Sequence, residues 1–119
     1  MTIRLHGIPN CDTVKRARAW LTDQGVAHEF IDFKKAGASD ADLQRWAAAV
    51  GWQQLLNRQG TTWRKLDPAT QAEIVDEASA RRLMQAQTSV IKRPVVDWPG
   101  GSVSVGFSPA DWEKRLVRN

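Results

Sequence analysis

The segment His6-Gly7-Ile8-Pro9-Asn10-Cys11-Asp12-Thr13-Val14-Lys15-Arg16 contains the only cysteine of the chain. A strand-like run, residues 2–5, precedes this segment, and a helical pattern, residues 12–24, follows it. The glycine and the proline between them favour a turn. Cys11 is therefore expected at the entrance of a helix. There, unpaired backbone N–H groups and the helix dipole favour a thiolate over a thiol.

A single cysteine is often a small buried residue without a chemical role. Here, however, its neighbours Pro9, Asn10 and Asp12 are typical of loops and surfaces. They favour a reactive thiol over a buried one. Lys15 lies about one helical turn further on and is a candidate for lowering the pKa of Cys11.

Length and composition indicate one ordinary globular domain, residues 1–119. One cysteine cannot form an internal disulfide, and no apolar run approaches the length of about 20 residues that a membrane span needs. The N-terminal residues do not read as a signal peptide, so a cytoplasmic protein is expected. The net charge of +4 is spread along the chain without a nucleic-acid-binding motif. Neither nucleic acid nor membrane is therefore an expected partner, and nothing requires more than a monomer.

The first part of the chain predicts a βαβ unit. Val14, Ala17 and Leu21 recur at helical spacing, and residues 27–33 read as a second strand. Two strands joined by one helix in about thirty residues are expected to be parallel.

Residues 39–87 predict a helical insert. Ser39 is expected to cap its first helix, and Asp67-Pro68 to begin another that runs to about residue 77 and buries Ile74 and Val75. Residues 34–38 are expected to form a loop, and residues 79–87 a final helix with Leu83 on its inner side.

The last part predicts a hairpin of residues 94–97 and 102–105, followed by a helix that buries Trp112 and Leu116. The element order is then β-α-β, a helical insert, and β-β-α. This is the order of the thioredoxin-like α/β fold with a mixed four-stranded sheet. In that fold the loop after the first strand carries the reactive thiol.

Spacing excludes several chemistries for Cys11. Val14 stands where a dithiol motif needs its second cysteine, and Ala17 stands where a phosphatase-type loop needs arginine. With only His6 and His28 besides the cysteine, no metal site is expected. A Cys-His hydrolase remains possible, although His6 is expected to pack or to face solvent. A monothiol remains, and it needs an external thiol such as glutathione to resolve its adducts.

Three motifs together resemble one family. They are Gly7-Ile8-Pro9-Asn10-Cys11-Asp12-Thr13-Val14-Lys15, Leu55-Leu56-Asn57-Arg58 with Gly60-Thr61-Thr62-Trp63, and Ile91-Lys92-Arg93-Pro94-Val95. The chain resembles the ArsC-like family of arsenate reductases, which is related to the regulator Spx, and within it the small YffB-type proteins. The resemblance covers nearly the whole chain and implies a thioredoxin-like sheet with a helical insert.

The resemblance also implies a set of site residues. Cys11 would be the nucleophile, Arg58 and Arg93 would be catalytic arginines, and Pro94 would follow a cis peptide bond. Guanidinium groups bind carboxylates or oxyanions bidentately and favour a thiolate. No bound cofactor is implied; glutathione would be a co-substrate, and glutaredoxin a possible partner. The candidate glutathione-binding residues are Asn10, Lys15, Arg58, Arg93 and Pro94.

One departure from the family concerns residues 102–108, which contain no basic residue where the glutathione-linked arsenate reductases carry a third arginine. The preferred prediction is therefore a glutathione-dependent thiol/disulfide reductase with a single cysteine nucleophile. A glutathione- and glutaredoxin-linked arsenate reductase is the alternative enzyme. An Spx-like regulator that binds RNA polymerase is an alternative of another class, although Val14 replaces the second cysteine that Spx typically carries.

Overall fold

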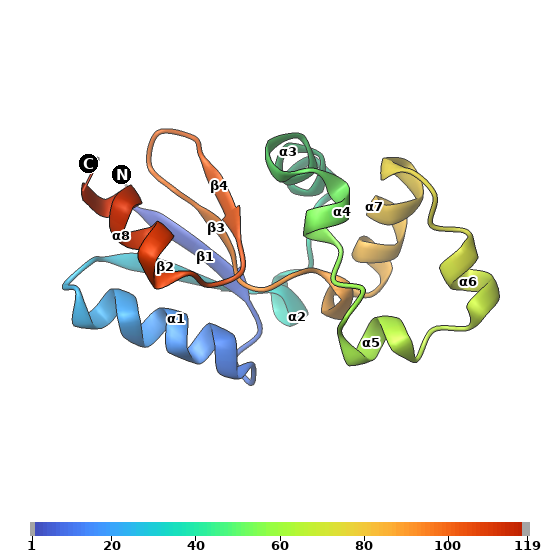
Figure 1. Ribbon diagram of the computed structural model, residues 1–119, viewed down its shortest axis with the longest axis horizontal. Coiled ribbons are helices and arrows are strands. Elements are labelled where there is room, and N and C mark those ends of the chain that lie inside the picture. Colours follow the sequence, from blue (N-terminus) through green and yellow to red (C-terminus); the bar gives the residue numbers. More distant parts are fainter. Residues whose placement is uncertain (1, 118–119) are drawn as a thin grey trace. The chain divides into compact units, whose positions relative to one another are not determined.

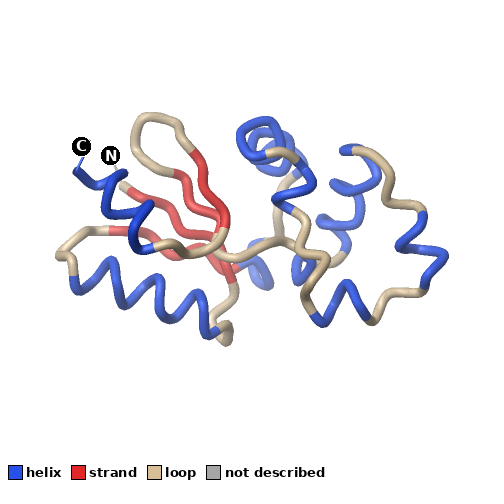
Figure 2. Tube along the Cα trace, in the orientation of Figure 1, coloured by secondary structure: helices blue, strands red, loops and turns tan. Residues whose placement is uncertain are grey.

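The computed structural model describes residues 2–117 of the chain (Figure 1). The described residues form two compact units. The first comprises the chain up to Asp32 together with the chain from Arg93 onward, and the second comprises Phe33–Lys92. The second unit therefore contains the predicted helical insert, residues 39–87, and extends beyond it at both ends. The assignment of residues 1–119 to one domain stays a prediction. All named strands belong to the first unit (Figure 2).

The first unit is built on a four-stranded mixed sheet in the order β2-β1-β3-β4. Strands β1 and β2 are parallel, and β3 is antiparallel to both β1 and β4. This arrangement confirms the predicted βαβ unit, the hairpin and the thioredoxin-like α/β fold. The strands are β1 (Ile3–Gly7), β2 (His28–Asp32), β3 (Val95–Asp97) and β4 (Val103–Val105).

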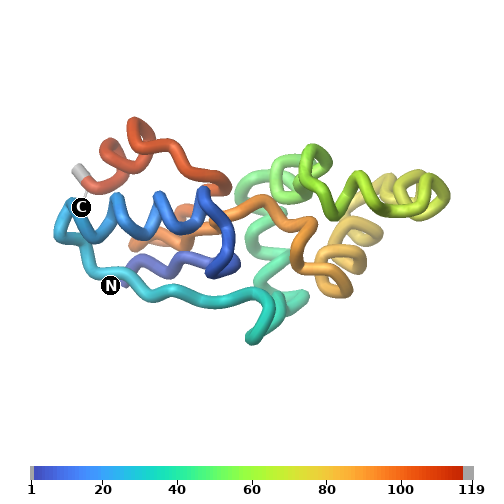
Figure 3. Tube along the Cα trace, turned by 90° about the horizontal axis from the view of Figure 1, so that it is seen from below, coloured from blue at the N-terminus to red at the C-terminus, as the bar shows by residue number. Residues whose placement is uncertain are grey.

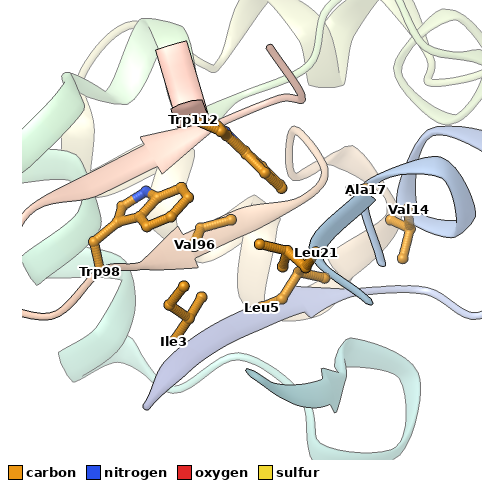
Figure 4. Close-up of a cluster of buried hydrophobic side chains, with 8 residues drawn as sticks. All are labelled: Ile3, Leu5, Val14, Ala17, Leu21, Val96, Trp98 and Trp112. Carbon is orange, nitrogen blue, oxygen red and sulfur yellow. The ribbon is translucent and has the colours of Figure 1, made fainter. Parts of the chain in front are cut away.

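Helices α1 (Asp12–Asp23) and α8 (Pro109–Val117) pack against the same side of this sheet (Figure 3). Alternate residues of β1 and residues at helical spacing in α1 supply one apolar cluster, because a strand repeats every two residues and a helix every 3.6. Figure 4 shows the cluster: Ile3, Leu5, Val14, Ala17, Leu21, Val96, Trp98 and Trp112. The predicted inner face of the last helix is confirmed, since Trp112 is buried and Leu116 packs against the cluster.

Gly7 at the end of β1 allows the first turn of α1 to approach the sheet. A Cβ atom at this position would lie 2.7 Å from Cγ2 and 3.3 Å from Cγ1 of Val14, which is fully buried. Any side chain at position 7 would therefore push against the start of α1. The glycine keeps the helix entrance, where Cys11 lies, close to the strand.

The second unit is helical. Ser39 caps α3 as predicted, accepting a hydrogen bond from the Asp42 N–H at 3.1 Å, and Asp67 caps α6. Its elements are α2 (Phe33–Ala36), α3 (Asp40–Val50), α4 (Trp52–Leu55), α5 (Thr61–Arg64), α6 (Pro68–Ala72), α7 (Glu77–Ala86) and a 3-10 turn (Thr88–Val90).

Three local predictions for this unit are wrong. Residues 33–36 form a short helix instead of a loop, and α6 ends at Ala72 instead of near residue 77. Val75 is 72% exposed instead of buried. The helix cannot continue to residue 77, because Asp76 has an extended backbone conformation and is the N-cap of the next helix.

Asp76 and Ser79 form a reciprocal capping box at the start of α7. The Asp76 carboxylate accepts a hydrogen bond from the Ser79 N–H at 2.9 Å, and the Ser79 hydroxyl oxygen accepts one from the Asp76 N–H at 3.1 Å. The backbone and side-chain hydrogen bonds from Ser79 hold the pKa of Asp76 below its ordinary value.

We expect Asp76→Ala to lower the melting temperature by a few degrees, because α7 loses its N-cap acceptor. Asp76→Asn keeps an acceptor oxygen, so it should lower the melting temperature much less. Because the pKa of Asp76 is lowered in the folded state, the carboxylate stabilises the fold above its unfolded pKa, and this contribution is lost as pH falls through the folded pKa. Thermal unfolding of the three proteins across the acid range tests this. Equal melting temperatures at neutral pH would show that the cap is dispensable.

Candidate active site at the entrance of helix α1

Cys11 is the N-cap residue of α1 and has an extended backbone conformation. Its N–H donates a hydrogen bond to the Ile8 carbonyl at 3.3 Å, and its carbonyl accepts one from the Lys15 N–H at 2.9 Å. The first bond closes the turn after β1, and the second is the first intrahelical bond of α1. The sulfur is partly buried and packs beside the apolar cluster of the first unit. The predicted position at a helix entrance is therefore confirmed.

The surroundings of Cys11 favour the thiolate. Burial raises the pKa of the thiol, but the Val14 N–H, the Arg93 guanidinium and the Thr13 N–H together outweigh burial and lower the pKa below its ordinary value. The Cys11 side chain makes no capping hydrogen bond of ordinary geometry with the helix. A neutral sulfur is a weak acceptor, whereas a thiolate accepts strongly, so the amides act mainly on the charged form.

Arg93 reaches Cys11 from the start of the hairpin. Its guanidinium hydrogen-bonds to the Cys11 side chain and also attracts the negative charge electrostatically. The peptide bond between Arg93 and Pro94 is cis, as the resemblance implies. The Pro94 carbonyl accepts a hydrogen bond from the Gly106 N–H at 2.9 Å, and Pro94 is buried. The hydrogen bond at Pro94 therefore helps to position Arg93 beside the thiol, although the two residues are far apart in the sequence.

Asn10 and Lys15 flank this centre. Asn10 lies in the turn before the helix, and Lys15 lies in the first turns of α1; both side chains are exposed. Neither is among the groups that lower the pKa of Cys11. Their roles in binding stay predictions.

His6 is buried in the sheet, with 3% of its surface exposed. Its Nε2 lies 2.9 Å from Oδ2 of Asp97, which is on the neighbouring strand β3. The ring is thus packed beside a carboxylate, so of the two expected positions, packed or facing solvent, His6 takes the first. Among residues 2–117, no group of three or more His, Cys, Asp and Glu side chains could hold a metal ion.

Arg58 belongs to the second unit and is exposed. The carbon atom at the centre of its guanidinium lies 5.3 Å from the centre of the Trp52 ring and 5.8 Å from that of the Trp63 ring. These distances place the cation against two indole rings. The predicted catalytic role of Arg58 stays a prediction.

Comparison with known proteins assigns the chain to a family. Residues 6–115 match the ArsC family. The chain belongs to the ArsC family. A solved structure described as the YffB protein is 50% identical, with a TM-score of 0.91, and the match covers 97% of this chain and 99% of that one. The predicted resemblance to YffB-type proteins is therefore confirmed.

Two further relatives agree with this assignment. An arsenate reductase (ArsC) related protein from Brucella melitensis is 48% identical with a TM-score of 0.75, and the match covers 98% of this chain and 95% of that one. An uncharacterized protein of Haemophilus influenzae is 32% identical over 111 residues, or 93% of this chain and 96% of that one. Within the described part of this ArsC-family protein, no helix is long and apolar enough to cross a membrane.

Sequence reasoning missed the partners of two predicted residues in this ArsC-family chain. Trp52 and Trp63 contact Arg58, and Asp97 binds His6. The alternation of β3 would have placed Asp97 on the face opposite Val96, the face that His6 shares. No comparable sequence pattern pairs Trp52 and Trp63, because they belong to different short helices.

Proposed function

We propose that this protein is a glutathione-dependent thiol/disulfide reductase with Cys11 as its single nucleophile. The observation that supports this is the convergence of the Arg93 guanidinium and the first amides of α1 on the one cysteine, which lowers its pKa. The thiolate is the reactive form of cysteine, so a lowered pKa increases the reactive fraction at neutral pH.

The proposed cycle has two exchange steps. The Cys11 thiolate attacks one sulfur of a disulfide that contains glutathione; a Cys11–glutathione S–S bond forms, the substrate S–S bond breaks, and the released substrate thiolate takes a proton from water. A second glutathione thiolate then attacks the glutathione sulfur of this adduct. That step regenerates the Cys11 thiolate and releases oxidised glutathione. A glutaredoxin dithiol could replace the second glutathione.

The remaining predicted residues have binding roles in this proposal. Glutathione carries two carboxylates at neutral pH, and guanidinium groups are suited to bind them bidentately. Arg93 would hold one end of glutathione at the sulfur, with Asn10 and Pro94 presenting backbone and side-chain groups. Arg58 and Lys15 would supply further positive charge. A reaction that consumes reduced glutathione fits a reducing, cytoplasmic setting.

Arsenate reduction is the second candidate, because the Brucella melitensis relative is described as related to arsenate reductase. Residues 102–108, which include β4, carry no basic side chain for a third oxyanion contact. We therefore expect arsenate turnover with glutathione and glutaredoxin to be slower than disulfide turnover. Faster turnover of arsenate would reverse this order of preference.

The first experiment is incubation with oxidised glutathione, followed by intact mass measurement. We expect one glutathione per chain, no adduct in Cys11→Ser, and removal of the adduct by reduced glutathione.

The second experiment measures the rate of Cys11 alkylation against pH. This rate should have its midpoint below the ordinary cysteine pKa of about 8.5. A midpoint at or above that value, or no adduct, would refute the proposal. Saturable, Cys11-independent binding to the RNA polymerase α subunit would favour the regulator instead.

A further inference from the structure

The second unit contains a polar groove of about 210 Å³. Two cationic side chains, Arg58 and Lys92, line it together with four side-chain amides, and no carboxylate is among the lining residues. Its electrostatic character is therefore positive, with many hydrogen-bonding groups. The amides are Gln53, Gln54, Asn57 and Gln59.

Backbone pairing joins the two segments that carry Arg58 and Lys92. The Asn57 N–H donates to the Val90 carbonyl at 2.7 Å, and the Lys92 N–H donates to the Leu55 carbonyl at 2.8 Å. An antiparallel bridge joins the residues between these two bonds. The side chains at this pairing are buried, so the fold brings the backbone of the Arg58 segment and that of the Lys92 segment to the same groove; they are Leu55, Leu56, Val90 and Ile91.

Arg58 is also oriented in advance. Trp52 and Trp63 contact its guanidinium, with centroid distances of 5.3 Å and 5.8 Å. Within residues 2–117, neither Arg58 nor Lys92 forms an ion pair. By contrast, Arg81 of the same unit binds both Asp40 and Glu77. The Arg58 guanidinium therefore lies beside two indole rings and has no ion-pair partner among the described residues, so it is available to bind an anion.

Asn57 adds a directed donor. Its side-chain oxygen accepts a hydrogen bond from the Gln59 N–H at 3.2 Å, which fixes the amide. A Cβ atom at Gly60 would lie only 2.8 Å from Nδ2 of Asn57. The glycine therefore leaves room for the amide NH₂ group in its observed position.

We infer that this groove binds the carboxylate-bearing end of a short peptide. Arg58 and Lys92 would bind the carboxylate, and the side-chain amides would bind the adjoining peptide group. The groove has a volume of about 210 Å³, so the inference places one end of the peptide in it and leaves the rest of the peptide outside. Trp52 and Trp63 are positioning residues for Arg58. The choice of glutathione as the natural peptide rests on the proposed function, whereas the groove itself needs no cysteine.

The test uses the Cys11→Ser protein and S-methylglutathione, a probe that cannot exchange disulfides. Titration calorimetry should show saturable binding with one site. Arg58→Gln and Lys92→Gln should each weaken binding by about tenfold, as expected for loss of one charge-assisted contact. Arg64→Gln, which removes an exposed charge elsewhere in the same unit, should leave the affinity unchanged. Equal effects of all three changes would overturn the inference.

Two comparisons define the ligand and the role of the rings. Esterifying the glycine carboxylate of the probe should weaken binding. If inorganic phosphate displaces the probe and binds as tightly, the peptide assignment is wrong.

The role of the rings is tested by Arg58→Lys. This change should weaken binding in the parent protein, but much less when Trp52 and Trp63 are both replaced by leucine, because the advantage of an oriented guanidinium is then lost. An unchanged cost of Arg58→Lys would refute the positioning role, and circular dichroism would check that the variants fold.

This inference and the proposed function can fail separately. Failure of S-methylglutathione to bind would overturn the inference that the groove binds a peptide end, although an adduct could still form on wild-type Cys11. Binding of the probe without any adduct on Cys11 would support the inference about the groove and refute the proposed reductase function.

Discussion

Trp112→Ala is expected to lower the free energy of unfolding by about 3–5 kcal/mol, the usual cost of removing a buried large aromatic side chain. Trp112 is 1% exposed and lies in the apolar cluster between α1, α8 and the sheet (Figure 4). Its ring meets those of Trp98 and Phe107 edge-on, with centroid distances of 5.2 Å and 4.8 Å. Alanine would leave a cavity and remove these aromatic contacts at once. A loss of this size is a large share of the stability of a small domain.

Urea unfolding followed by circular dichroism measures this effect without relying on tryptophan fluorescence. Trp112→Phe should lower the free energy of unfolding clearly less than Trp112→Ala does, because phenylalanine keeps a ring against Trp98. Val75→Ala is the matched surface control, since Val75 is 72% exposed and should change stability little. A loss below about 1 kcal/mol in Trp112→Ala would mean that the cluster closes over the cavity and that Trp112 does not support the core.

Sequence patterns predicted the helical part of this core because its residues repeat at the period of a helix. Val14, Ala17 and Leu21 recur along α1, and Trp112 and Leu116 are one helical turn apart. The patterns failed where the secondary-structure preference of a short segment is weak. The four-residue helix α2 has little stability of its own, and its Phe33 is buried against Trp46 at a ring distance of 6.0 Å. Tertiary packing, which periodicity does not report, decides such a segment.

The candidate site was predictable to a different extent for each residue. The loop and helix signals around Cys11 predict a thiolate position directly. The approach of Arg93 to Cys11 followed only from the family resemblance, because strand pairing brings together residues that are distant in sequence. The groove beside Arg58 had no sequence signal, since it depends on the pairing of residues 55–57 with residues 90–92. Short-range patterns do not contain that information.

Arg93→Gln is expected to slow alkylation of Cys11 at neutral pH by about tenfold, the effect of losing one hydrogen bond to a charged group. The substitution removes the guanidinium that hydrogen-bonds to the sulfur and attracts its charge, while burial continues to raise the pKa. The pKa of Cys11 should therefore rise toward its ordinary value. Well above that value both proteins are thiolates, and the rate difference should vanish or reverse slightly, because a more basic thiolate is the better nucleophile.

Arg4→Gln is the control for loss of one positive charge. Arg4 lies on β1, is about half exposed and pairs with Glu29 at 4.0 Å, so its loss should not move the alkylation profile. Equal shifts of the alkylation profile in the two variants would indicate that the overall charge of the protein acts on Cys11, and not a direct contact with Arg93, and would contradict the role of Arg93.

Folding stability gives an independent check of the lowered pKa of Cys11. Because the pKa of Cys11 is lowered in the folded state, its thiolate stabilises the fold above the unfolded pKa, and this stability is lost as pH falls through the folded pKa. The stability difference between wild type and Cys11→Ser should thus grow with pH across that window, and Arg93→Gln should flatten the growth.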